Sequence, residues 1–195
     1  AAVIVAVTAA ASLIVFSLLP GPAGLDAAGL AAALDAAASG EQIVITGGGR
    51  FDLPGLDLGD RNLAIRGEDP RPVLRFVTSS DDLEQSLFRT SGDLVLTGLS
   101  LELVVGPDAP DDVVRSLIEL DGGILRLEDC TLEVVGEGDC VIARDCAELE
   151  VIDSSLHAPQ GTVIDWTPAA GGEATAERTI VSGRTGWAVA DPVDA

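Results

Sequence analysis

The sequence predicts an all-β fold in which short strands wind into the coils of a solenoid, and two observations lead to this prediction. First, one phrase of alternating apolar residues recurs: Leu94–Val104 reads LVLTGLSLELV, Leu125–Val135 reads LRLEDCTLEVV and Leu149–Ala158 reads LEVIDSSLHA. Second, after Gly40 short apolar runs are separated by Gly, Asp and Pro, and no further helix is strongly indicated. Irregular repeats of this kind are typical of solenoids.

The first element is an apolar stretch without charge. Residues 1–19 carry no ionisable side chain, and the first charged residue is Asp26. Nineteen helical residues span roughly 28 Å, close to the hydrocarbon thickness of a bilayer. We therefore expect residues 1–21 to form a transmembrane or signal-anchor helix that tethers the chain to the membrane. The alternatives are the apolar part of a cleaved signal peptide and a buried core helix.

The orientation of that anchor follows from its flank. No Lys or Arg appears on its C-terminal side before Arg50. Because basic residues are enriched on the cytoplasmic side, this favours an extracytoplasmic location for the rest of the chain. The expected localisation is a single-pass membrane protein with its second domain, residues 25–195, outside the cytoplasm.

The second element is a short helix over residues 25–39, LDAAGLAAALDAAAS. Alanine has the highest helix propensity, and Leu30 and Leu34 lie one turn apart on one face. Gly40 is expected to end this helix.

The remaining elements are the strands of the repeat, and a doublet of apolar residues opens each unit. The doublets are Ile43/Ile45, Leu63/Ile65, Leu94/Leu96, Leu125/Leu127, Leu149/Val151 and Ala174/Ala176. Their first members are 20, 31, 31, 24 and 25 residues apart. In a solenoid the strands of successive coils pair in parallel about 4.8 Å apart, so equivalent side chains stack into columns.

Further columns follow from the same alignment. A second apolar column is Leu101, Leu132, Leu156 and Val181, and a third is Leu103, Val134, Ala158 and Gly183. The corner between the two strands of each unit carries Gly98, Asp129, Asp153 and Arg178. Arg126 and Glu150 are predicted to lie side by side and to point outward.

The residues that precede the repeat resemble the entry into a known fold. A helix LAAALDAAASGEQIVI is followed by FDL, LDLGDRNLAIRG and RPVLRF, which resembles the start of a right-handed parallel β-helix of the pectin-lyase-like superfamily. The resemblance covers about residues 25–187 and implies right-handed winding, about five to six coils and an N-terminal helix that caps the first coil. The stretch also resembles ectodomains of membrane-anchored bacterial proteins, some of which carry a cytoplasmic serine/threonine kinase domain.

Composition narrows the classes of partner and cofactor. The chain of 195 residues has 32 acidic residues against 11 arginines and no lysine, for a net charge of −21. Such a charge opposes binding to nucleic acid. The three cysteines, Cys130, Cys140 and Cys146, form no CxxC motif and are accompanied by one histidine, a pattern that argues against a structural zinc site. They are interpreted as small buried residues.

Candidate catalytic residues come from the corner column. The superfamily's hydrolases use clustered aspartates on neighbouring coils, and its lyases use carboxylate-bound Ca²⁺ with an Arg or Lys base. Asp129 and Asp153 occupy the same corner on adjacent coils, with Arg126 and Arg178 close by, and are the best catalytic-looking group. The competing interpretation is a solvated turn in which Asp is chosen for its backbone hydrogen bond.

Candidate metal ligands come from an outward column. Glu102 and Glu133 stack on adjacent coils, with His157 next in the column. Their repulsion would be relieved by Ca²⁺, a hard cation that prefers oxygen ligands, or His157 would act as a partial counter-charge to Glu133. An ordinary exposed column without metal is the competing interpretation, and no other cofactor is predicted.

Three functions remain open at this stage. The preferred one is a non-catalytic extracytoplasmic scaffold or recognition domain that binds polysaccharide or another protein. The second is a carbohydrate-active β-helix that uses Asp129 and Asp153. The third is the sensor end of a bacterial serine/threonine kinase whose catalytic domain lies upstream of residue 1.

Overall fold

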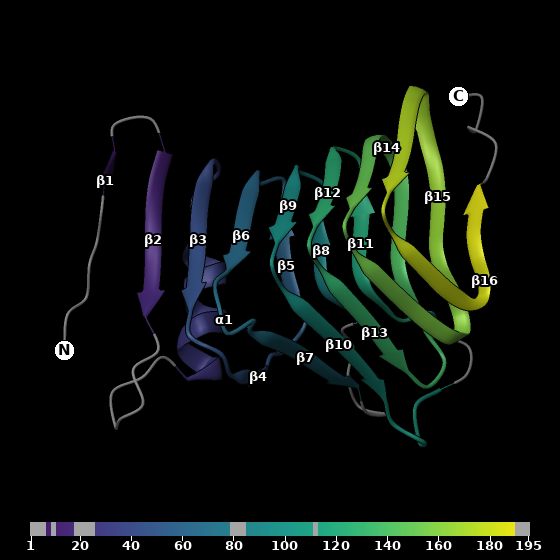
Figure 1. The fold of residues 1–195 in the computed structure, drawn as a ribbon, viewed down its shortest axis with the longest axis horizontal. Coiled ribbons are helices and arrows are strands. Elements are labelled where there is room, and N and C mark those ends of the chain that lie inside the picture. Colours follow the sequence, from purple (N-terminus) through teal and green to yellow (C-terminus); the bar gives the residue numbers. More distant parts are fainter. Residues whose placement is uncertain (1–6, 9–10, 18–25, 79–84, 111–112, 190–195) are drawn as a thin grey trace.

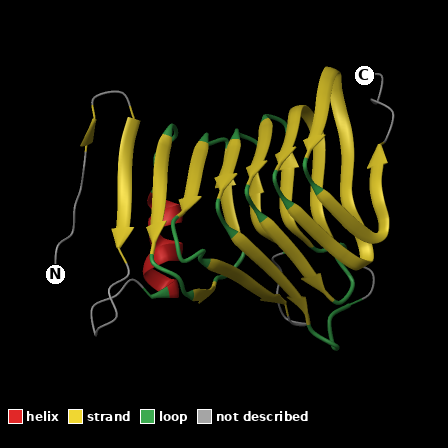
Figure 2. Cartoon of the chain, viewed as in Figure 1, coloured by secondary structure: helices red, strands yellow, loops and turns green. Residues whose placement is uncertain are grey.

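The computed structural model describes residues 7–8, 11–17, 26–78, 85–110 and 113–189. Over these residues the chain is an all-β protein, with a long, curled, mostly parallel sheet and one short helix near its N-terminal end (Figures 1 and 2). The all-β fold and the repeated parallel strands predicted from the sequence are therefore confirmed.

The strands fall into three ladders of parallel pairs. The first ladder contains β2 (Ala11–Ser17), β3 (Glu41–Thr46), β6 (Leu63–Gly67), β9 (Leu94–Thr97), β12 (Ile124–Glu128), the end of β14 (Asp139–Ile152) and the end of β15 (Ser155–Glu177). The second contains β4 (Arg50–Asp52), β7 (Val73–Thr78), β10 (Ser100–Val105), β13 (Thr131–Val135), the start of β15 and the start of β16 (Ile180–Val189). The third contains β5 (Leu56–Gly59), β8 (Ser86–Thr90), β11 (Ser116–Asp121), the start of β14, the middle of β15 and the end of β16. Outside the ladders, β1 (Val7–Thr8) pairs with β2 in antiparallel fashion.

The pairing register confirms the predicted stacking of leucines. Leu125 pairs with Leu94 on one side and with Leu149 on the other, and all three side chains are fully buried. Leu132 likewise pairs with Leu101 and Leu156. Side chains of alternate residues therefore enter one continuous dry core, which is where most of the stabilising hydrophobic burial occurs.

The first step of the predicted alignment is wrong by two residues. Ile43 pairs with Ile65, and Leu63 pairs with Glu41, so the step is 22 residues rather than 20. Side chains along a strand alternate between faces with a period of two, so a shift of two keeps the same residues inside. The apolar pattern fixes the buried face and leaves this shift undetermined.

A tryptophan fills part of the core near the C-terminal end of the described chain. Trp166 belongs to the buried core, and the partly buried Trp187 packs against that core one strand further on. Aromatic side chains supply large apolar area here, where the first-ladder column has shrunk to Ala174 and Ala176.

The corner between the first and second ladders, the first corner, lies at the residues where the sequence predicts it. Asp129, Asp153 and Arg178 have φ of 52°, 49° and 49°, and Gly98 has φ of 66°. This left-handed conformation suits glycine and is tolerated by aspartate. At Gly98 there is a second constraint, because an added Cβ would lie 2.7 Å from the carbonyl oxygen of Gly67.

The corner between the third and first ladders, the third corner, carries a chain of side-chain hydrogen bonds that joins successive coils. The Ser39 hydroxyl accepts from the Asn62 N–H at 3.0 Å, the Asn62 Oδ1 accepts from the Asp93 N–H at 2.9 Å, and the Asp93 Oδ1 accepts from the Ile124 N–H at 3.0 Å. Each bond satisfies a backbone donor at a turn, where no strand partner is available.

The N-terminal helix α1 (Ala27–Ala36) forms within the predicted range and places Leu30 and Leu34 in the core. Asp26 caps its N-terminus by accepting a hydrogen bond from the Gly29 N–H at 2.8 Å. The prediction that Gly40 ends the helix is wrong. Helical geometry stops at Ala36, and Gly40 belongs to the turn that leads into β3.

The end of α1 is held by an arginine from the first coil. The Arg61 Nη1 donates to the carbonyl oxygens of Asp35 at 2.6 Å, Ala37 at 2.8 Å and Leu34 at 3.3 Å, and its Nε donates to Leu58 O at 2.7 Å. The last carbonyls of a helix lack intrahelical partners, and a cation there also complements the helix dipole.

Replacing Arg61 with alanine is expected to lower the free energy of unfolding by about 2 kcal/mol, because several carbonyl groups lose a charged donor. Urea denaturation followed by circular dichroism measures the change. The matched variant Arg66→Ala, in which an exposed arginine is truncated, is expected to leave the midpoint unchanged. Equal midpoints for the two variants would contradict the capping role.

The N-terminal apolar stretch differs from its prediction where the structure describes it. The sequence predicts a helix over residues 1–21, but residues 11–17 form β2, which pairs in parallel with β3. The β-branched and aromatic residues in LIVF fit a strand as well as a helix, and a short apolar run does not distinguish the two. The other residues of this stretch, apart from 7–8 in β1, lie outside the described residues. No helix within the described ranges is long and apolar enough to cross a bilayer.

Candidate functional site

The two aspartates predicted as a catalytic pair each have an arginine of their own. Asp153 receives two hydrogen bonds from Arg178, at 2.5 and 2.8 Å. Asp129 receives one from Arg71 at 2.5 Å, and Arg71 also reaches the Thr131 hydroxyl at 3.1 Å. Arg178 lowers the pKa of the Asp153 carboxyl, which therefore stays ionised. The structure does not bring Arg126 to these aspartates, because Arg126 pairs with Glu150 at 3.0 Å as the register predicts.

The two glutamates predicted as metal ligands lie side by side as expected. Glu102 pairs in register with Glu133, which in turn pairs with His157. Glu102 is also held by Arg50 at 2.8 Å and by Arg75 at 3.5 Å. These arginines provide the counter-charge for which the sequence suggested Ca²⁺. Among the described residues, no group of three or more His, Cys, Asp or Glu side chains is placed to hold a metal ion.

The cysteines are buried free thiols, as predicted. Burial raises the pKa of Cys130 to about 11 and that of Cys140 to about 12. The thiols are therefore neutral at physiological pH, and a neutral thiol is a poor nucleophile. The Cys130 Sγ donates to the Leu96 carbonyl oxygen at 3.4 Å, which fits a packing role.

A groove that the sequence did not reveal runs along the second corner, between the second and third ladders. Two adjoining hollows of about 330 and 190 Å³ share the walls formed by Val113, Arg115, Glu137 and Gln160. Segments from successive coils line the larger hollow, namely 113–115, 137–139, 160–162 and 184–185. We call these two hollows together the corner groove. Because each segment comes from the next coil, the groove follows the stacking direction of the strands.

Arg115 forms a buried wall of the corner groove. Only 3% of the residue is exposed, and its Nη1 donates to the carbonyl oxygens of Pro110 at 2.9 Å and Val113 at 3.1 Å. These bonds fix the position of the guanidinium group, and Arg115 is among the residues that line both hollows. A planar guanidinium with five donors is suited to the recognition of oxygen acceptors.

Asp139, which also lines the larger hollow, is bonded to the coils on both sides of its own. Its Oδ1 accepts from the Thr162 N–H at 2.6 Å, and its backbone N–H donates to the Arg115 carbonyl oxygen at 2.8 Å. Burial raises the pKa of the Asp139 carboxyl, and the nearby charge of Asp165 adds to this effect, while the bond from Thr162 opposes it. The groove therefore combines a fixed cation with a half-buried carboxyl group whose proton is held more tightly than usual.

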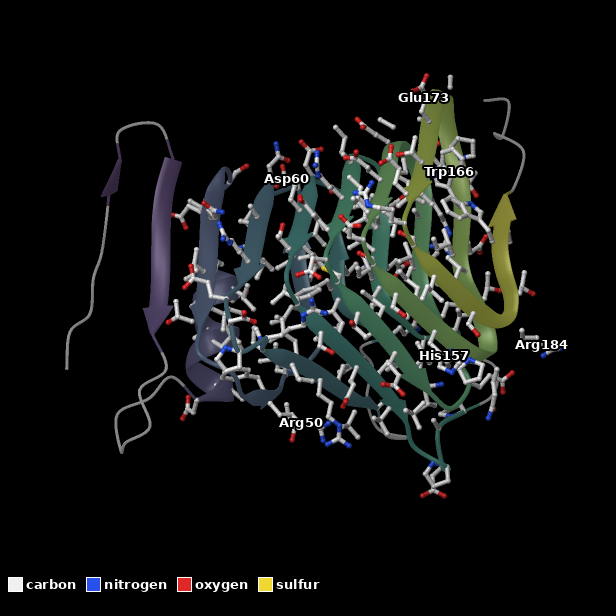
Figure 3. The ribbon with its side chains drawn as sticks, in the orientation of Figure 1. Arg50, Asp60, His157, Trp166, Glu173 and Arg184 are labelled. Atoms are coloured by element: carbon white, nitrogen blue, oxygen red, sulfur yellow. The ribbon has the colours of Figure 1, made fainter. Side chains whose placement is uncertain are left out.

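The open end of the groove lies near the C-terminal end of the described chain. Arg184 and Thr185 in β16 complete the larger hollow, and Figure 3 shows Arg184 projecting away from the strands at that end. His157, labelled in the same view, lies nearby on β15 but is not part of the groove. The groove thus presents two arginines and two carboxylates along its length.

Sequence reasoning missed this groove because its walls combine loops with parts of β14, β15 and β16 that come from neighbouring coils. The segment GPDAPDDVVRS, residues 106–116, interrupts the repeat and by itself indicates only a longer coil. One signal was present: Arg115 directly precedes the apolar strand SLIEL, where a buried environment begins. A charged residue at such a boundary is a candidate for a positioned donor.

The fold defines the class of this protein as all-β, built on a long curled parallel sheet. No protein-family model matches the chain, and no curated protein matches it significantly.

Proposed function

We propose that this chain is a non-catalytic recognition domain and that the corner groove is its binding surface. We further propose that the curled parallel sheet is a right-handed parallel β-helix of about six coils, of the pectin-lyase-like type. The observation that carries the functional proposal is the corner groove itself, in which four successive coils present polar groups along one line around the buried Arg115.

An extended ligand fits this arrangement better than a compact one. Successive coils are spaced by about 4.8 Å, so the four segments that line the larger hollow span roughly 14 Å. A chain molecule that lies along the groove meets a similar polar environment at each coil, as in other solenoids with elongated binding surfaces. Hydroxyl, carbonyl or amide groups of a polysaccharide or polypeptide supply acceptors for Arg115 and donors for Glu137.

The ion pairs at the first corner support a non-catalytic role. Two carboxylates that share a proton have pKa values pushed apart by mutual repulsion. Asp129 and Asp153 are instead neutralised separately by Arg71 and Arg178. Aspartates in left-handed turns with an arginine partner are explained by turn geometry and ion pairing.

The membrane tether predicted for residues 1–19 stays a prediction, as does the extracytoplasmic location. Fractionation of cells that produce the full chain, followed by protease accessibility of intact cells, tests both. Recovery of the chain in the supernatant after membrane sedimentation would contradict the tether.

Binding tests the role of the groove. Soluble polysaccharides and extended peptides are screened by calorimetry against the full chain, and the best binder is titrated into Arg115→Gln. The loss of a charged hydrogen bond is expected to weaken binding about tenfold. Arg126→Gln, which alters an outward arginine on the first ladder, serves as the control and is expected to bind as the parent does.

An activity screen tests the competing function. The chain is incubated with uronic-acid polymers with and without Ca²⁺, and released unsaturated or reducing ends are measured. No product is expected. Cleavage that disappears in Asp129→Ala or Asp153→Ala would overturn the non-catalytic proposal in favour of a carbohydrate-active enzyme.

A further inference from the structure

The outward face of the second ladder differs from the rest of this acidic chain. We call it the B face, defined by the outward residues of β4, β7, β10, β13 and the starts of β15 and β16. Its middle column runs Asp52, Arg75, Glu102, Glu133, His157 and Ser182 in register. With Arg50 at its edge, the face carries two arginines against three carboxylates, whereas the whole chain carries 11 basic and 32 acidic residues. A close approach of another acidic molecule therefore meets less repulsion here than the net charge of the chain implies.

The B face also holds most of the exposed large apolar side chains. Four such side chains are exposed among the described residues, and Val77, Val135 and Ile180 lie on this face at 44%, 49% and 67% exposure. Val104 pairs in register between Val77 and Val135, so three valines form one outward column. Exposed apolar residues that stack into a column mark a contact surface more strongly than scattered ones.

The charges along the B face can pair with those of a second copy that is rotated by 180°. Consider a twofold axis that lies parallel to β10 and between two copies whose B faces meet. The axis places β7 of one copy opposite β13 of the other, so Val77 meets Val135 of the second copy and Val104 meets its own equivalent. The same rotation places Arg75 opposite Glu133 of the second copy. Each residue contact then occurs twice, as a twofold interface requires.

The same rotation also brings complementary side chains together on the outer strands β4 and β15. The rotation places Asp52 on β4 opposite His157 on β15, which is a donor for a carboxylate. Figure 3 shows Arg50 and His157 toward opposite ends of this face. At the centre Glu102 faces its own equivalent, but Arg50 and Arg75 of the same copy already neutralise it.

We propose that the B face is a homodimer interface, in which two copies of this chain pack face to face about a twofold axis parallel to β10. Two sheets packed in this way lie about 10 Å apart with nearly aligned strands, and the two valine columns form the apolar part of the interface beside the charged middle columns. A second copy fits this face because the strands on the two sides of β10 carry opposite charges at matching positions. The twofold rotation therefore brings Arg75 of each copy opposite Glu133 of the other. The proposal is independent of the corner groove.

The mass of the full chain in solution tests the proposal. Light scattering over a concentration series is expected to show a rise from 19.9 kDa toward twice that value. Val104→Asp places two like charges at the twofold axis and is expected to abolish the rise. The control Val95→Asp changes an outward, half-buried valine of the first ladder and is expected to dimerise as the parent does. Circular dichroism establishes that both variants are folded.

A charge exchange tests the orientation. Glu133→Arg alone places an arginine opposite Arg75 of the second copy and is expected to weaken dimerisation. Adding Arg75→Glu restores a pair of opposite charges between the copies. Within its own chain Glu102 still has two arginines beside it, namely Arg50 and the arginine introduced at position 133. Recovery of the dimer in the double variant supports this axis. A parent chain that stays monomeric throughout the series, or a dimer indifferent to Val104→Asp, would overturn the proposal.

Discussion

Replacing Leu127 with aspartate is expected to unfold the chain at room temperature. Leu127 is fully buried and lies between Leu96 and Val151 in one column. A carboxylate there loses its hydration and finds only apolar neighbours, which costs more than about 4 kcal/mol. Because the stability of a domain is typically about 5–15 kcal/mol, most of it is lost.

The measurement is a urea titration monitored by circular dichroism, with Leu127→Ala and Val95→Asp beside it. Leu127→Ala creates a cavity and is expected to cost about 2–5 kcal/mol without loss of the fold. Val95→Asp introduces the same charge on an outward position and is expected to change the midpoint only slightly. A folded Leu127→Asp with an unchanged midpoint would show that this column is not buried.

Replacing Gly161 with alanine is expected to have the second largest effect. A Cβ at this position would lie only 1.9 Å from the carbonyl oxygen of Gly138 and 2.8 Å from the Oδ1 of Asp139. The backbone of one coil must therefore move away from the next, which breaks the 2.6 Å bond from Thr162 to Asp139. We expect a loss of about 3 kcal/mol or more, at the upper end of overpacking effects.

The matched control for this substitution is Gly186→Ala. There the nearest atom to an added Cβ is the Val181 Cγ1 at 3.7 Å, an ordinary contact distance. Thermal melts of the two variants are compared with the parent, and only Gly161→Ala is expected to melt early. Identical melting of both would mean that the two coils do not approach closely at this corner.

The apolar pattern predicts the fold well because it reports which side chains are buried. Leu125 and Leu127 alternate with Arg126 and Glu128, and that alternation fixes the inward face of their strand. The same pattern leaves a shift of two residues open, which is why it predicts Leu63 beside Ile43, where the structure has Ile65. Pairing register depends on turn length, and turn length is not encoded in apolar alternation.

The candidate site was harder to predict because ion pairing and grooves arise from residues far apart in the chain. Asp129 was recognised as a corner residue, but its partner Arg71 lies 58 residues earlier. Glu102 was expected beside Glu133, whereas Arg50 comes from two coils before. Arg115 gives only a local hint, since the corner groove forms where loops and strand segments from successive coils meet.

The first corner has a consequence for how this architecture changes. Its turn has two residues in each of the last four described coils, namely 98–99, 129–130, 153–154 and 178–179. The connections at the second corner vary more in length, from residues 136–138 to residues 106–115. The molecule therefore has a turn of constant length along one edge and a permissive edge along another. New binding specificity is expected to be grafted as insertions at the permissive edge, beside the corner groove, without disturbing the stacked core.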